Sequence, residues 1–278
     1  MHRWNDRPIR EIGKREVLEA IDAIVDRGTG TQANRTLSHV RKLFNWALER
    51  DIVTISPCAG LKAPAGENSR DRVLSDDEIR WLWKACEAQA FPFGPLVRLL
   101  LLTGQRRGEV AGIRAGELSF RNQMWSLPKE RTKNGEAHDV PLTEAVISIF
   151  KSLPQIAGEG FVFTNTGVTP VSGFSRAKAS IDKLMAEAAA RQASTIEPWT
   201  LHDLRRTCAS GMASLKIAPH IIEAVLNHKS GTIRGVAAVY NRHQYADEKR
   251  EALEKWAWRV AVVVHGDRNV VAFRARSS

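Results

Sequence analysis

Cysteine and long apolar runs are scarce in this sequence. Its 278 residues include three cysteines, Cys58, Cys86 and Cys208, which lie far apart and form no CxxC pair. This spacing argues against a disulfide framework or a zinc ribbon and favours a reducing compartment. The most apolar stretch, residues 95–104, is interrupted by Arg98 and is too short to span a bilayer. The first residues, MHRWNDRPIR, lack the apolar core of a signal peptide. We therefore expect a cytoplasmic protein.

Motifs for nucleotide and metal chemistry are also missing. The sequence contains no GxxxxGK[ST] loop to hold a nucleotide phosphate and no HExxH pair of zinc ligands. It has no tight group of carboxylates of the kind that holds two metal ions. We therefore expect neither a cofactor nor a metal.

Acidic residues are outnumbered by basic ones. The chain has 41 Lys and Arg against 31 Asp and Glu, a formal net charge of +10. Such a charge attracts polyanions, of which nucleic acid is the commonest. A soluble basic protein without such a partner is the alternative, and charge alone separates the two poorly. The length suits two domains rather than one small domain.

The N-terminal part has the apolar period of helices. Residues 14–28 form one predicted helix, which ends at Gly28. Residues 31–51 form a second predicted helix, and its apolar residues recur at steps of three and four: Ala33, Leu37, Val40, Phe44 and Ala47. Arg35 and Lys42 fall on its other faces, where they can meet water or phosphate.

Residues 64–73, rich in Pro, Gly and charge, indicate a linker between two domains. Ser75 and Glu78 then form a capping box that begins a new helix. Two β-prone runs flank Asn134-Gly135, which is a strong hairpin signal. Residues 160–165 predict one more short strand, and residues 260–278 predict two strands about a Gly-Asp turn. The expected fold class is mainly α with a small antiparallel β-sheet.

The stretch TLHDLRRTCAS, residues 200–210, predicts a helix that carries His202 and Arg205 one turn apart. Thr200 can cap this helix, with Asp203 in the reciprocal position. His202 lies in the first turn, where the helix dipole disfavours imidazolium and favours anions. A neutral imidazole beside a guanidinium suits a phosphate site. On these residues alone, a surface pair is the better interpretation.

A second cluster follows an apolar helix, in LLLLTGQRRGEVAGIR. Arg106 at the buried end of that helix is costly unless it meets an anion or a carboxylate, and Glu109 can hold its side chain. The alternative is an ordinary helix end whose basic residues satisfy carbonyl groups. Lys133, at the tip of the predicted hairpin, is either solvated or a mobile proton donor, and Lys129 and Arg131 compete for that role.

The only two tyrosines, Tyr240 and Tyr245, both follow His228 within a short stretch. A phenol becomes a nucleophile where nearby cations favour its ionised form. The alternative is a pair of half-buried tyrosines that pack the last helix, and it stays open for Tyr245.

Five segments in this order resemble the tyrosine recombinase (phage integrase) family: TGQRRGE, RTKNG, HDLRRT, LNH and VYNRH. The similarity is greatest to integrases of temperate phages and genomic islands. The resemblance implies a helical core-type DNA-binding domain at residues 1–63 and a linker at 64–73. It also implies a mixed α/β catalytic domain at residues 74–259. Residues 260–278 would then be a C-terminal β segment or tail, which is either exchanged between subunits or folded back on its own domain.

The resemblance also assigns roles by position. Arg106 and Arg205 would be the two catalytic arginines, with Glu109 supporting the first. The remaining catalytic residues would be the hairpin lysine, two histidines and the nucleophile, namely Lys133, His202, His228 and Tyr240. Arg35 and Lys42 are the candidate DNA-binding residues of the N-terminal domain.

One expected feature of this branch has no counterpart in the sequence. Its integrases normally carry an additional N-terminal domain that binds arm-type DNA sites. This chain begins at MHRWNDRPI, which is similar to the interior of such a protein. We therefore expect that domain to be lacking, either in a fragment or in a naturally short member.

The implied activity is site-specific DNA recombination, or integration, through a 3′-phosphotyrosyl intermediate. The implied partners are double-stranded attachment sites, accessory DNA-bending proteins and three further copies of the chain on DNA. We expect a monomer or weak oligomer when free, nucleoid association when bound, and no membrane. Two alternatives remain open: an architectural or regulatory DNA-binding protein of the same fold, and a relaxing enzyme like the type IB topoisomerases.

Overall fold

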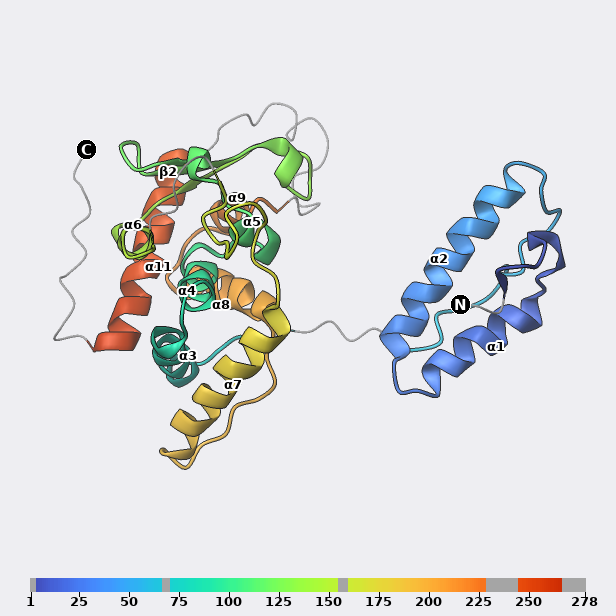
Figure 1. The fold of residues 1–278 in the computed structure, drawn as a ribbon, viewed down its shortest axis with the longest axis horizontal. Coiled ribbons are helices and arrows are strands. Elements are labelled where there is room, and N and C mark those ends of the chain that lie inside the picture. The colour runs from blue at the N-terminus through green and yellow to red at the C-terminus, as the bar shows by residue number, and fades with distance from the viewer. Residues whose placement is uncertain (1–3, 67–70, 155–159, 229–244, 267–278) are drawn as a thin grey trace. The chain divides into compact units, whose positions relative to one another are not determined.

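The computed structural model describes residues 4–66, 71–154, 160–228 and 245–266. The chain divides into two compact units, Met1–Arg70 and Asp71–Ser278 (Figure 1). We call them the N-terminal unit and the C-terminal unit. Within the described ranges, no helix combines the length and hydropathy that crossing a membrane requires.

The N-terminal unit is a helical pair with its own core. A short 3-10 helix, η2 (Ile9–Glu11), precedes α1 (Lys14–Val25) and α2 (Gly30–Leu48), which pack against each other. Gly28 ends the first helical segment with φ 75°, a left-handed conformation that glycine adopts without steric cost. The apolar face predicted for residues 31–51 is confirmed, because all five of its apolar residues are buried.

The C-terminal unit begins with α3 (Asp76–Ala88), α4 (Phe93–Thr103) and α5 (Arg107–Ala111). The 3-10 helix η3 (Ala115–Glu117) leads into the strands β1 (Leu118–Ser119), β2 (Met124–Leu127) and β3 (His138–Pro141), with η4 (Lys129–Arg131) between the last two. Within the described ranges, five helices follow: α6 (Glu144–Lys151), α7 (Phe174–Ala190), α8 (Leu201–Ser214), α9 (Pro219–Leu226) and α11 (Ala246–His265).

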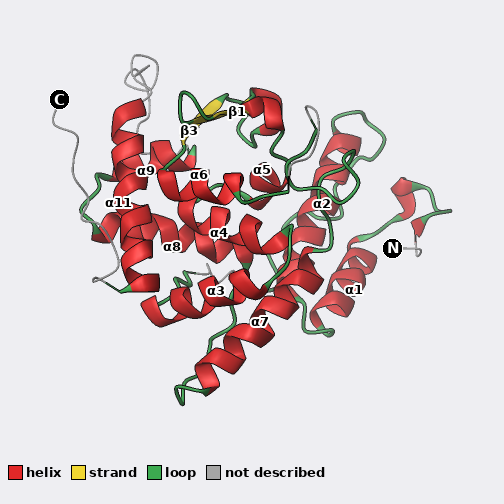
Figure 2. Cartoon of the chain, turned by 60° about the vertical axis from the view of Figure 1, so that its left-hand side comes forward, coloured by secondary structure: helices red, strands yellow, loops and turns green. Residues whose placement is uncertain are grey.

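Helix α4 is the centre of this unit. Figure 2 shows it among α3, α6, α8 and α11, and it contacts all four. Its residues from Leu99 to Thr103 are each no more than 2% exposed, as expected of a helix that is apolar on every side. The indole Nε1 of Trp256, on α11, donates to the carbonyl oxygen of Leu101 at 2.8 Å. The end of α4 is therefore fixed deep inside the unit.

The caps and the sheet agree with the sequence-based predictions. Ser75 accepts from the N–H of Glu78, whose carboxylate accepts in return from the N–H of Ser75 at 2.8 Å. The three strands form one antiparallel sheet in the order β1-β2-β3. The predicted hairpin about Asn134-Gly135 is thus confirmed, as is the mainly α fold class with a small sheet.

The predicted strands near the C-terminus are wrong where the structure describes them. Residues 260–265 continue α11, and Val260 and Val263 are buried on the same helix face as Trp256. Burial at helical spacing outweighs the β propensity of this valine-rich run. The rest of that prediction lies outside the described residues. Residues 160–165 form no strand either; Phe161 makes a single bridge with Arg114.

Candidate active site

Arg205 is a buried guanidinium held by backbone carbonyls. It lies in the second turn of α8, where only 7% of it is exposed. Its Nη1 donates to the carbonyl oxygen of Gly104 at 2.8 Å, and its Nη2 donates to that of Leu226 at 2.5 Å. Burial, and then the charge of Arg106, lower the pKa of Arg205 to about 10. The group therefore stays protonated at neutral pH.

Arg106 lies at the N-cap of α5, two residues after the left-handed Gly104 that ends α4. Glu109, which is buried, accepts from the backbone N–H of Arg106 at 2.9 Å and from its Nη1 at 2.7 Å. The Nη2 of Arg106 donates to the carbonyl oxygen of Asn227 at 3.3 Å. The carboxylate and the carbonyl together fix the direction of this second guanidinium.

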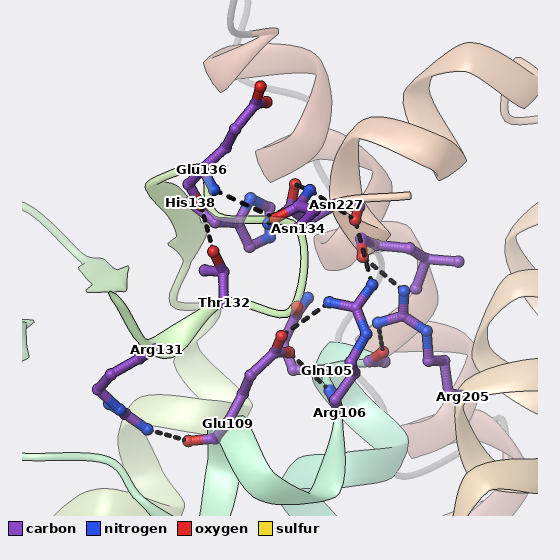
Figure 3. Close-up of polar contacts among 12 residues, drawn as sticks. Gln105, Arg106, Glu109, Arg131, Thr132, Asn134, Glu136, His138, Arg205 and Asn227 are labelled. Carbon is purple, nitrogen blue, oxygen red and sulfur yellow. Dashed lines mark hydrogen bonds and ion pairs between the residues drawn. The ribbon is translucent and has the colours of Figure 1, made fainter. Parts of the chain in front are cut away.

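The C-terminal end of α9 brings these groups together, as Figure 3 shows. The last carbonyls of a helix carry a partial negative charge and need donors from elsewhere. Gln105 Nε2 and His138 Nε2 lie 2.9 and 3.1 Å from the carbonyl oxygen of Val225. Leu226 and Asn227 receive the two arginines. Side chains from three separate parts of the chain therefore converge on three consecutive carbonyls.

His202 lies in the first turn of α8 and is exposed, although neighbouring side chains partly shield its imidazole from water. The N–H of the cap residue Thr200 donates to the carboxylate of Asp203 at 2.7 Å, as the capping prediction requires. Burial lowers the pKa of His202, and the charges of Arg206 and Arg205 lower it further. The imidazole is therefore neutral at pH 7 and can accept a proton.

A hollow of about 480 Å³ opens beside His202. Its wall also includes Arg107, whose guanidinium lies 4.9 Å from the ring centre of Phe174. Lys178 contributes a further cation to the wall and stands 3.8 Å from the ring centre of Trp199. Cations on aromatic walls suit an anion that carries an apolar portion, such as a nucleotide unit.

Lys133 and His228 lie near the same region because the residues next to them in the chain are hydrogen-bonded to each other. Lys133 is exposed in a turn in which the N–H of Gly135 donates to the carbonyl oxygen of Thr132 at 3.3 Å. Its neighbour Asn134 is hydrogen-bonded to Asn227 at 2.7 Å, and Asn227 directly precedes His228. Arg106, Arg205 and the chain positions of these two residues therefore share one end of α9.

Of the two tyrosines, only Tyr245 lies within the described residues, and Tyr240 lies outside them. Tyr245 stands at the N-cap of α11 with φ 48°, and its ring centre is 5.4 Å from that of His220. It packs, partly buried, against the core of the C-terminal unit.

Besides His138, sequence reasoning missed three polar residues of this cluster, namely Gln105, Asn134 and Asn227. Each lies inside a segment that had been singled out for another residue, TGQRRGE, RTKNG or LNH. The available signal was Asn227 directly after the apolar run IIEAVL, because asparagine is one of the few residues that tolerate the left-handed conformation that often ends a helix. Its partner Asn134 is 93 residues away in the sequence, so no local pattern could have paired them.

A mainly helical unit with a small sheet and two arginines directed at one helix end is the architecture of a tyrosine recombinase catalytic domain. Residues 72–247 match the phage integrase family, and residues 2–64 match the phage integrase central domain. The chain therefore belongs to the phage integrase family. Among the residues that the structure describes, no group of three or more His, Cys, Asp or Glu side chains could hold a metal ion.

The sequence similarity to known relatives covers most of this chain. Prophage integrase IntA of Escherichia coli K12 is 23% identical over 259 residues, which are 91% of this chain and 60% of that protein. The shufflon-specific DNA recombinase of Escherichia coli is 29% identical over 206 residues, 73% of this chain and 49% of the relative. This chain thus spans less than two thirds of the length of each of these two relatives.

Solved structures share the fold. A lambda integrase dimer bound to a COC′ core site aligns with a TM-score of 0.61 at 20% identity, over 82% of this chain and 83% of the other. The Tn1549 transposon integrase in complex with a circular intermediate DNA aligns with a TM-score of 0.61 at 16% identity, over 90% and 89% of the two chains.

Proposed function

We propose that this chain is a site-specific DNA recombinase that cleaves and rejoins DNA through a 3′-phosphotyrosyl intermediate. One observation carries the proposal: the guanidinium groups of Arg106 and Arg205 are both fixed at the C-terminal end of α9, on consecutive carbonyls. Glu109 balances one of these two permanent cations, and the second needs a further anion in this partly buried place. A phosphodiester is the anion that a phage integrase acts on.

The two arginines stabilise the transition state. A guanidinium has more N–H donors than the carbonyl bonds of Arg106 and Arg205 use. The remaining donors bind the non-bridging oxygens, where charge builds up as the phosphorus becomes five-coordinate. Because the groups are already fixed by Glu109, Gly104 and Leu226, little reorganisation is needed. Loss of one such donor costs roughly 3 kcal/mol, or about a hundredfold in rate.

The attack on phosphorus and its proton transfers give the other residues their proposed roles. Tyr240 attacks phosphorus as its phenol proton passes to neutral His202, forming the Tyr–phosphate bond. The bond from phosphorus to the 5′-oxygen breaks, and Lys133 gives a proton to that oxygen. His228 donates a hydrogen bond to a phosphate oxygen. Attack by the 5′-hydroxyl of a partner strand then reverses these steps, and the broken ester needs no nucleotide to be remade.

Tyr240 is a better candidate nucleophile than Tyr245. Tyr245 is bound into the fold: it caps α11, its ring lies against His220, and it is partly buried against the core. A residue with these packing contacts cannot swing to a phosphate without loosening the start of α11. Tyr240 is the tyrosine of the VYNRH segment, which carries the family resemblance.

The N-terminal unit supplies DNA contacts. Arg35 and Lys42 are exposed on the face of α2 that is opposite its buried side. On the same face, Arg50 stands 4.6 Å from the ring centre of Trp46. We assign Arg35 and Lys42 to phosphate contacts, which orient the duplex without reading its sequence.

The proposed assembly is four copies of the chain on two double-stranded attachment sites, with accessory DNA-bending proteins as further partners. Lambda integrase has been solved as a dimer bound to a core site and as a tetramer bound to a Holliday junction. These assemblies support the proposal, because the present chain has the same fold.

The test is capture of a covalent adduct. A library of nicked duplexes with a randomised core is incubated with the 278-residue chain, and DNA that stays attached under denaturing conditions is sequenced. The nick lets the cleaved fragment diffuse away, so the adduct accumulates. We expect a recovered consensus site, loss of the adduct with Tyr240→Phe, and its retention with Tyr245→Phe.

Other outcomes would replace the proposal. Specific binding without any adduct would identify an architectural or regulatory DNA-binding protein. Relaxation of supercoiled plasmid without dependence on a site would identify a topoisomerase-like enzyme. Loss of the adduct with Tyr245→Phe but not with Tyr240→Phe would reverse the assignment of the nucleophile.

A further inference from the structure

We propose that Asn134 and Asn227 form an amide latch that positions Lys133 for leaving-group protonation. This inference rests on the proposed function, because it concerns the residue that gives the proton to the 5′-oxygen. The two asparagines are positioning residues in this proposal, since neither of them need touch the DNA.

The backbone conformation of Asn227 sets the direction in which the chain leaves α9 towards His228. Asn227 adopts the left-handed conformation, with φ 47° and ψ 48°, directly after α9. Its N–H donates to the carbonyl oxygen of Ala224 at 3.3 Å, and the N–H of His228 donates to that of Glu223 at 3.0 Å. This pair of bonds is the Schellman motif, which ends a helix with a sharp change of direction.

The side chain of Asn227 makes a reciprocal amide pair. Its Oδ1 accepts from Nδ2 of Asn134 at 2.7 Å, and its Nδ2 donates to Oδ1 of Asn134 at 3.3 Å. Both side chains are partly buried, so water competes less for these bonds than at an open surface. Glycine would fit the same backbone conformation, but it would offer no amide.

The other end of the latch is the turn that carries Lys133. Asn134 directly follows Lys133, and its Oδ1 also accepts from the N–H of Glu136 at 3.3 Å. The hydroxyl of Thr132 donates to the carbonyl oxygen of Glu136 at 2.7 Å, which braces the loop from the other side. The backbone on both sides of Lys133 is therefore fixed, although its side chain is exposed and has no partner among the described residues.

Asn227 also accepts a hydrogen bond from Arg106. Its carbonyl oxygen accepts from Nη2 of Arg106 at 3.3 Å and from Nδ2 of Asn134 at 3.4 Å. Asn227 therefore ties the turn of Lys133 to the guanidinium that binds the phosphate. Lysine is a flexible cation whose own geometry does not preorganise it, so the fixed turn supplies the positioning.

Three variants test the latch. Asn227→Gly keeps the left-handed backbone and the carbonyl group but removes one amide. Asn134→Ala removes the other amide. Asn122→Ala is the matched control, because Asn122 is exposed in the β1–β2 turn of the same sheet and its side chain makes no hydrogen bond among the described residues.

Each variant is assayed for the single-turnover rate of adduct formation on the duplex selected above, in two forms. One form has the natural 5′-oxygen at the cleaved bond, and the other has a 5′-bridging sulfur. A thiolate leaves without protonation, so a defect in Lys133 affects only the oxygen form. A structural defect slows both.

We expect Asn227→Gly and Asn134→Ala each to slow cleavage of the oxygen form by about tenfold, the effect of losing a hydrogen-bonded pair that positions a catalytic group. The sulfur form should react within about twofold of wild type. The double variant should be no slower than either single variant, because both changes break one interaction. Lys133→Ala should show the same selectivity with a larger loss, and Asn122→Ala should change neither rate.

Equal slowing of both DNA forms by Asn134→Ala would overturn the latch, as would an unchanged rate on the oxygen form. Asn134 lies in a turn outside any helix or strand, so its variant decides the question even if Asn227→Gly is poorly folded. A wild-type chain that forms no adduct with any duplex would instead refute the proposed function.

Discussion

The Nη1 of Arg205 donates a hydrogen bond of 2.8 Å to the carbonyl oxygen of Gly104, which lies 101 residues earlier in the chain. Gly104 ends α4 in the left-handed conformation, so its carbonyl group lies beyond the helix and has no partner within it. The guanidinium supplies that partner. The position of Arg205 therefore depends on the backbone of a glycine.

Gly104→Ala should lower the free energy of unfolding by about 3 kcal/mol. A left-handed conformation costs an alanine about 1–2 kcal/mol, and overpacking costs about 1–3 kcal/mol. The new Cβ would lie 2.9 Å from Cδ2 of Leu226 and 3.0 Å from Sγ of Cys208. Urea denaturation measures the loss. The control is Gly135→Ala, which has φ +71° but no atom within 4 Å of the new Cβ. An equal loss in both variants would show that the space around Gly104 has no effect.

Stability should fall as the pH is lowered through the titration of His138. Burial, and then the charge of Lys249, lower the pKa of this imidazole from 6.5 to about 4. The native state therefore binds fewer protons than the unfolded state between these two values, so acid favours unfolding there. The contribution of His138 to the free energy of unfolding is about 3 kcal/mol; it is present in full above pH 6.5 and is lost by about pH 4.

The variant His138→Gln separates this contribution from those of the other histidines. Glutamine keeps an N–H for the carbonyl oxygen of Val225, which the imidazole contacts at 3.1 Å, but it does not titrate. Urea denaturation at a series of pH values should give a shallower acid limb for the variant. A limb as steep as that of wild type would mean that His138 is not the titrating group.

Arg206→Gln should raise the pKa of His202. The charge of Arg206 is the largest cause of its lowered pKa after burial, and the change also frees the Asp203 carboxylate from its ion pair with Arg206. A general base must be unprotonated to act, so the acid limb of the cleavage rate should move to higher pH. NMR titration of His202 checks the pKa directly.

Arg191→Gln is the control for that titration, because Arg191 is an exposed residue at the end of α7 and does not contribute to the pKa of His202. Its variant should titrate as wild type does. A rate profile that moves without any change in the His202 titration would assign the limb to another group.

Arg35→Ala and Lys42→Ala should each weaken DNA binding and reduce its dependence on salt. Each lost phosphate contact lowers the slope of log K against log salt concentration by about 0.9. Fluorescence anisotropy with a duplex of unrelated sequence, at several salt concentrations, measures this slope. Arg15→Ala, which removes an exposed cation of α1 that is paired with Glu19, should change neither the affinity nor the slope. If all three variants behave alike, the outer face of α2 has no special role in binding DNA.

Local residue patterns were enough to predict the second helix and two helix caps. The apolar period of α2, the Ser75–Glu78 box and the Thr200–Asp203 cap each depend on residues within a few positions of one another. Interactions over such short separations are fixed by local spacing. Five short segments in a fixed order also sufficed to indicate the family, because the residues within each segment suggest a chemical role when they are taken together.

How those segments meet follows from long-range contacts. The pairing of Asn134 with Asn227 and the bond from Arg205 to Gly104 join residues 93 and 101 positions apart, and no local pattern encodes them. Residues 260–265 show that a local pattern can also predict the wrong structure. Their valines favour a strand locally, but burial against the core of the C-terminal unit makes them the last turns of α11. Long-range packing outweighs local propensity here. The burial of apolar side chains stabilises the fold by more than the difference between the helix and strand propensities of these residues.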